Sequence, residues 1–240
     1  MTGRKMKMLS RNIAVLLSSL MLVQHASASD ALTSDETNNN VHFYVAENSG
    51  SSAINTTDPF EMIKSVADIT FKRFANEQTE IRKNPNLLKK IVREELVPYI
   101  DYRYAAFKVI GAKNFKNTTS EERDAFVPVF LDYLVTSYAQ VFTLYNSQEV
   151  KFEKARISNS GRIAFVKTLV IEPGREPIDI SFSTRKGKNA DEWKAYDMVA
   201  EGISMLDSKE AELGSLIRQK GLPHVTELLK EKAAKDIVFK

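Results

Sequence analysis

The sequence contains no cysteine among its 240 residues. This absence excludes disulfide bridges, a thiolate nucleophile, a cysteine-ligated metal and a lipid anchor on an N-terminal cysteine. Histidine is almost as scarce, because only His224 of the three histidines lies beyond residue 57, where we expect the fold to begin. One histidine cannot make the usual zinc site. We therefore expect no metal, and an exposed His224.

Motifs for catalysis are also missing. The sequence has no glycine-rich phosphate loop, no nucleophile elbow and no HExxH pair. Asp197 and Glu201, with Tyr196 beside them, are a weak candidate for proton transfer. Short acids at a strand end more simply accept backbone N–H groups or pair with a cation. We favour that structural role, and we expect no catalytic residue.

The first 28 residues have the pattern of a cleavable signal peptide. Four basic residues and no acid precede an apolar run at Ile13–Val23, and the small residues Ala26-Ser27-Ala28 follow. Cleavage there would take 28 from 240 residues and leave 212. Because an exported chain without cysteine fits a bacterial periplasm better than a eukaryotic extracellular space, we expect periplasmic localisation in a Gram-negative bacterium.

The basic excess belongs to this signal peptide. It holds 4 of the 34 basic residues and none of the 31 acids, so the mature chain has 30 basic against 31 acidic residues. A nucleic-acid partner needs a dense basic footprint, which is therefore absent. The run Ile13–Val23 is shorter than the ~18 residues that span a bilayer, and we find no other stretch that comes close. We expect a soluble mature protein.

Residues 29–57 should form a flexible leader, because 14 of these 29 residues are Ser, Thr or Asn. A single domain over 58–240 follows. Helical spacing of apolar residues predicts helices over 58–82, 84–98, 101–110, 120–145, 206–220 and 222–235. The helix over 120–145 has an aromatic apolar face, with Phe130, Leu134, Tyr138 and Phe142 at successive turns.

Between the fourth and fifth helices the apolar pattern changes to a period of two. It predicts strands at Glu149–Ile157, Ile163–Ile171, Ile178–Arg185 and Glu192–Val199, joined by short turns rich in Gly, Pro and Asn. Consecutive strands with short turns form an antiparallel meander. The predicted fold class is α+β, with about six helices wrapped around a four-stranded antiparallel sheet.

Several of these segments resemble one known family. They are Glu95-Leu96-Val97-Pro98-Tyr99, the stretch from Thr119 to Tyr138, the run Trp193-Lys194-Ala195-Tyr196-Asp197-Met198-Val199-Ala200-Glu201-Gly202-Ile203-Ser204, and Leu216–Leu222. In this order they are similar to the periplasmic phospholipid-binding proteins of the Mla pathway, the MlaC or toluene-tolerance family. The resemblance covers about residues 58–232.

The resemblance implies an NTF2-like α+β fold around an apolar lipid cavity, and a monomeric carrier. Its cargo would be a glycerophospholipid, with no cofactor. It would shuttle lipid between two membrane complexes and so maintain outer-membrane lipid asymmetry. These are the inner-membrane ABC transporter with its ring of MCE domains and an outer-membrane lipoprotein–porin complex.

Helical spacing, strand position and this resemblance together indicate the residues that would line the lipid cavity. They are Phe130, Leu134, Tyr138, Phe142, Ile178, Ile180, Val199 and Ile203. Arg123, Arg175 and Arg218 lie at the ends of expected elements, where a charge is free to meet a partner, and are the candidates for docking.

Two alternative functions stay open. One is an enzyme of the ketosteroid-isomerase kind, and the other is a binding module whose cavity is filled by side chains.

Overall fold

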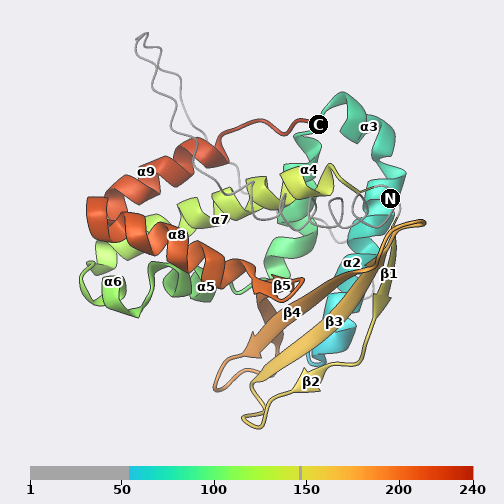
Figure 1. Ribbon diagram of the computed structural model, residues 1–240, viewed down its shortest axis with the longest axis horizontal. Coiled ribbons are helices and arrows are strands. Elements are labelled where there is room, and N and C mark those ends of the chain that lie inside the picture. Colours follow the sequence, from blue (N-terminus) through green and yellow to red (C-terminus); the bar gives the residue numbers. More distant parts are fainter. Residues whose placement is uncertain (1–53, 146–147, 240) are drawn as a thin grey trace, which may run out of the picture.

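The computed structural model describes residues 54–145 and 148–239 (Figure 1). The expected signal peptide and residues 29–53 of the expected leader lie outside the described residues. The helices are α2 (Pro59–Asn76), α3 (Gln78–Lys83), α4 (Leu87–Ile91), the π-helical η1 (Val92–Leu96), the 3-10 helix η2 (Val97–Tyr99), α5 (Tyr102–Ile110), α6 (Ala112–Lys116), α7 (Ser120–Phe142), α8 (Met205–Lys220) and α9 (Leu222–Ala233). The strands are β1 (Glu149–Phe152), β2 (Arg156–Ile157), β3 (Ile163–Ile171), β4 (Ile178–Lys186), β5 (Trp193–Ala200) and β6 (Ile203–Ser204).

The sheet is antiparallel throughout, as the sequence predicts, but the expected number of four strands is wrong. It has six strands in the order β1-β3-β4-β5-β6, and β2 also pairs with β3. The first expected strand is interrupted at 153–155. In a regular strand Lys154 would share the face of Val150 and Phe152. The interruption leaves Lys154 exposed instead.

The sixth strand, β6, arises from a tight turn that pattern reading missed. Glu201 and Gly202 have φ angles of 51° and 79°. Two consecutive positive φ values match the turn that best joins twisted antiparallel strands. Ala200 therefore pairs with Ile203, and Val199 with Ser204. The available signal for this hairpin was the Glu201-Gly202 pair between the apolar residues Ala200 and Ile203.

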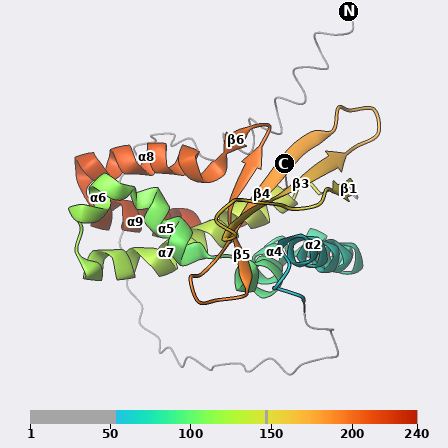
Figure 2. The ribbon, with the colours of Figure 1, turned by 90° about the horizontal axis from the view of Figure 1, so that it is seen from below.

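The strand register divides the sheet into two faces of different polarity. The inner face carries Val150, Phe152, Ala164, Val166, Thr168, Val170, Ile178, Ile180, Phe182, Thr184, Trp193, Ala195, Met198 and Ala200. The outer face carries Ile163, Phe165, Lys167, Leu169, Ile171, Asp179, Ser181, Ser183, Arg185, Asp197 and Val199. Met62 and Ile63 of α2 are buried against Ala164, Val166 and Trp193 of the inner face. Helix α2 therefore covers this part of the inner face (Figure 2).

The N-terminal helices differ from expectation at both ends. The folded part of the chain begins before Asp58, because the Trp193 N–H donates to the Thr56 carbonyl at 2.8 Å. Asp58 then caps α2, and its carboxylate accepts from the Phe60 and Glu61 N–H groups. The single helix expected over 58–82 is divided at Glu77 into α2 and α3. Neither proline nor glycine marks this break.

The second layer of the fold contains α5, α7, α8 and α9 (Figure 2). Thr119 and Glu122 form the expected capping box, and α7 ends at Phe142, three residues earlier than predicted. Contrary to expectation, α7 is long and apolar enough to cross a membrane by length and composition. Phe126, Phe130 and Val135 are nevertheless exposed by 1% or less, so packing inside the protein accounts for these three apolar side chains.

Candidate functional site

A group of apolar side chains on the inner face remains outside the packed core. Its members are Val150, Val170, Ile178, Ile180 and Met198, called the inner patch below. Each is only partly buried. None belongs to the three buried clusters found among the described residues. Ile178 and Ile180, two of the expected cavity residues, therefore lie together, with Val170 opposite Ile178 across the β3–β4 pair.

Tyr138 of α7 is largely buried in the molecule. Burial raises the pKa of the Tyr138 phenol to about 12, and the negative charge of Asp197 acts in the same direction. The residue nevertheless retains accessible surface. Tyr138 packs against the buried cluster that contains Phe74, Leu88 and Val135, so its expected role in a lipid cavity stays a prediction.

The structure does not bring all the expected cavity residues to one place. Phe130 is 1% exposed and stacks on Phe126, with ring centroids 5.6 Å apart, so side chains already fill its surroundings. Leu134 packs against the same buried cluster. Val199 pairs with Ser181 and lies on the outer face, whereas Ile180 lies on the inner face. Ile203 shares the inner face with Ala200, at the sheet edge, and is 50% exposed.

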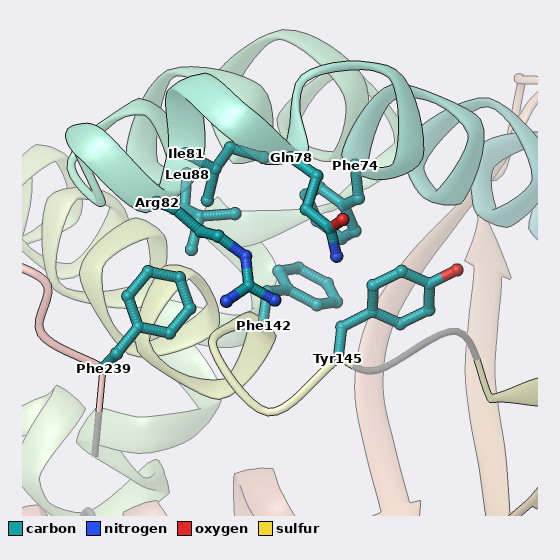
Figure 3. Close-up of a pocket in the computed structure, with 8 residues that line it drawn as sticks. All are labelled: Phe74, Gln78, Ile81, Arg82, Leu88, Phe142, Tyr145 and Phe239. Carbon is teal, nitrogen blue, oxygen red and sulfur yellow. The ribbon is translucent and has the colours of Figure 1, made fainter.

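Phe142 lines a separate small pocket between α2, α3, α4 and α7 (Figure 3). Its walls are Phe74, Gln78, Ile81, Arg82, Leu88, Phe142, Tyr145 and Phe239. The pocket has a volume of about 40 Å³. Since one water needs roughly 10–15 Å³ of such space, the pocket could hold a few water molecules and no acyl chain as it stands.

The candidate catalytic carboxylates have structural roles, as we favoured. The Asp197 carboxylate accepts from the N–H groups of Met198 and Leu206 at 2.8 and 2.9 Å, and from the Ser204 hydroxyl at 2.8 Å. Glu201 accepts from the Asp179 N–H at 2.7 Å. Asp197 thereby joins β5 to the start of α8, and both carboxylates are occupied by the fold itself.

Tyr196, beside the two candidate carboxylates, lies against another tyrosine. Burial is the main cause that raises the pKa of Tyr196, whose ring makes an edge contact with Tyr104 at 5.2 Å. His224 is exposed, as predicted. Within residues 54–145 and 148–239, no three His, Asp or Glu side chains lie close enough together to hold a metal ion.

The three candidate docking arginines differ in how much of their charge is free. Arg123 is partly buried, donates to the Phe115 carbonyl at 3.0 Å and to the Thr118 carbonyl, and lies 4.2 Å from the Phe115 ring centroid. Arg175 is exposed but pairs with Glu172 at 2.6 Å. Arg218 is exposed and makes no ion pair with any residue that the structure describes. Only Arg218 has the free charge that the prediction assumed.

Pattern reading missed the other members of the inner patch. Val150, Val170 and Met198 become neighbours of Ile178 and Ile180 only through the strand register. The alternation of apolar residues along each expected strand could have shown which residues share a face. It could not show which face the helices leave uncovered.

Helices on an antiparallel sheet whose apolar face is only partly covered define an α+β protein. The chain belongs to the MlaC family, because the family model described as "MlaC protein" matches residues 64–231. A Haemophilus influenzae relative, named intermembrane phospholipid transport system binding protein MlaC, is 31% identical over 188 residues. The match covers 78% of this chain and 87% of that relative.

The fold is also similar to a solved structure. It is that of a phospholipid-binding protein from Ralstonia solanacearum in complex with a phospholipid. The TM-score is 0.64 with 19% identity, and the alignment covers 74% of this chain and 97% of that one. This likeness supports the mixed helix and antiparallel sheet architecture.

Proposed function

We propose that this protein is a periplasmic carrier of glycerophospholipid and not an enzyme. The acyl chains would lie against the inner patch and near Tyr138, with the head group outside. The observation that carries the proposal is the inner patch itself, five neighbouring apolar side chains that no buried cluster includes, in a chain of the MlaC family. The architecture around such a cavity would be NTF2-like.

The physical requirements of lipid transfer agree with such a site. Two acyl chains contain roughly thirty CH₂ groups, and exposing them to water costs about 24 kcal/mol gross at ~0.8 kcal/mol each. A carrier must cover the chains and also release them, so apolar walls with few specific contacts suit the task. The inner patch offers only aliphatic and thioether groups. No cofactor is needed for binding or release.

The name of the Haemophilus influenzae relative places that protein in an intermembrane phospholipid transport system. We extend this role to the present chain as a monomeric shuttle. Its partners would be the MCE-domain ring of the inner-membrane ABC transporter and the outer-membrane lipoprotein–porin complex. The result would be maintenance of outer-membrane lipid asymmetry.

Native mass spectrometry of the protein purified from cells tests this function. We expect a bound mass equal to one glycerophospholipid, which organic extraction releases. Protein without lipid that turns over a small ketone would favour the isomerase-like alternative. The structure argues against that alternative, because both Asp197 oxygens already accept hydrogen bonds from Ser204 and Leu206. Protein without lipid or turnover, even after incubation with phospholipid, would favour the filled binding module.

A further inference from the structure

The last described residues, 234–239, cross α4 and α7 as a C-terminal strap (Figure 1). The Asn86 amide donates to Asp236 at 2.8 Å and accepts from the Ile237 N–H at 3.0 Å. The Gln140 amide holds Val238 in the same way, donating to its carbonyl at 2.7 Å and accepting from its N–H at 3.2 Å. Ile237 is 3% exposed, which anchors the strap in the core.

The outward side of the strap is apolar. Val238 is 55% exposed and Phe239 is 46% exposed. Leu144, 37% exposed, follows the end of α7 four residues after Gln140, whose side chain holds Val238. These are three of the six large apolar side chains that are exposed within the described ranges. Single exposed apolar residues need no explanation, but neighbouring ones mark a contact surface.

Cations border this apolar surface. The Arg82 side chain lies beside Phe239 at the small pocket (Figure 3), and no described acid forms an ion pair with it. The Lys89 ammonium donates to the Ala233 and Lys235 carbonyls at 3.1 and 2.6 Å. Lys235 itself is exposed. The strap's one acid, Asp236, accepts from the neutral Asn86 amide and keeps its charge, but these three cations outnumber it.

We propose that Leu144, Val238 and Phe239, together with Arg82, Lys89 and Lys235, dock the protein on an anionic phospholipid bilayer. Apolar side chains that enter the head-group boundary, bordered by Lys and Arg, are the combination that an anionic membrane surface attracts. Six residues give reversible attachment only, which suits a protein that must leave again. The inference goes beyond the proposed function, because it concerns the surface that meets the membrane and not the site that holds the lipid.

Vesicle co-sedimentation of the full chain tests the proposal. The vesicles are phosphatidylcholine alone, or phosphatidylcholine with phosphatidylglycerol. We expect binding to the anionic vesicles, weaker binding at high salt, and little binding to phosphatidylcholine alone. Equal binding to both vesicle types, or to neither, would overturn the proposal.

Substitutions assign the binding to the strap. Arg82→Gln and Lys235→Gln should each weaken binding to anionic vesicles about fivefold. The double change Val238→Ser and Phe239→Ser should weaken it on the order of tenfold. Ile157→Ser is the matched control, because Ile157 is 56% exposed but lies on β2, at the opposite end of the molecule from the C-terminus (Figure 1).

Strap variants that bind vesicles as well as the Ile157→Ser control would reject the proposal. The same variants are then examined for bound lipid by native mass spectrometry. Loss of vesicle binding with retained bound lipid supports the docking surface as distinct from the lipid site. Vesicle binding by a wild-type protein that never carries lipid would refute the proposed function while leaving the docking surface intact.

Discussion

Ile180 and Val199 are neighbours on adjacent strands, yet their side chains are on opposite faces of the sheet. Ile180 pairs with Ala200, while Val199 pairs with Ser181, one position away. Because side chains alternate along a strand, a shift by one residue exchanges the faces. The two residues are both partly buried and apolar, so they form a matched pair for locating the lipid site.

Ile180→Glu should reduce the lipid-bound fraction at least tenfold in native mass spectra, because an unpaired carboxylate against acyl chains is costly. Val199→Glu should leave that fraction within about twofold, since Val199 is on the outer face. Circular dichroism checks that both variants are folded. If Ile180→Glu does not fold, Ile178→Glu at the strand end replaces it.

Ile203→Glu should have an intermediate effect on bound lipid, because Ile203 is 50% exposed at the edge of the inner face. A carboxylate there can turn toward water. Full lipid loading of the Ile180, Ile178 and Ile203 variants alike would remove the inner face from consideration as the site.

Asp197→Ala should destabilise the protein by about 1–3 kcal/mol, because two N–H groups and one hydroxyl lose their acceptor. The measurement is urea unfolding, with Asp191→Ala at an exposed position as control. A fully stable, lipid-loaded Asp197→Asn variant that lost function in cells would instead indicate a chemical role.

Tyr138 should make stability fall at high pH. Its pKa is about 12 in the folded protein and ~10 in the unfolded chain. The unfolded chain therefore loses this proton first, and the stabilisation present below pH ~10 is lost as the pH rises toward 12. By pH ~11.5 wild type should lose about 2 kcal/mol relative to Tyr138→Phe. Urea unfolding of both proteins at pH ~9 and ~11.5 measures the difference, and equal losses would contradict a deep Tyr138.

Arg123→Ala should cost about 1–2 kcal/mol of folding free energy, because its guanidinium ties the end of α6 to α7 through the Phe115 and Thr118 carbonyls. Arg123→Lys should restore little, since an ammonium lacks the planar fork and stacks poorly on Phe115. Thermal unfolding gives the comparison. A stability equal to wild type in both variants would return Arg123 to the docking candidates.

Docking on protein partners is better tested at Arg175 and Arg218. Arg175→Glu and Arg218→Glu should slow labelled-lipid transfer to reconstituted membrane complexes at low salt, and less at high salt, with bound lipid unchanged. The Glu172→Gln variant removes the ion pair but keeps the Arg175 charge, so it serves as the control and should transfer lipid at least as fast as wild type. Wild-type transfer rates for both reversed variants at low salt would exclude these arginines as the docking surface.

The helices and the antiparallel sheet could be predicted because their signals are local. The Thr119–Glu122 capping box, the glycine that ends α5 and the period-two runs of β3 and β4 each depend on residues a few positions apart. The break at Glu77 had no such signal. The structural role of Asp197 could be inferred from chemistry, but its partner Leu206 is nine residues away and on another element.

The inner patch and the C-terminal strap were decided only by tertiary structure. The sequence determined that β3, β4 and β5 have an apolar face, because alternation assigns side chains to faces. It did not determine that α2 would cover Ala164 and Val166 but leave Ile178 and Ile180 outside the core. Nor did it reveal that Gln140 would hold Val238, 98 residues away. Which part of the apolar sheet face is covered depends on where helices distant in the sequence pack. Their positions follow from the packing of the whole chain and not from any local pattern.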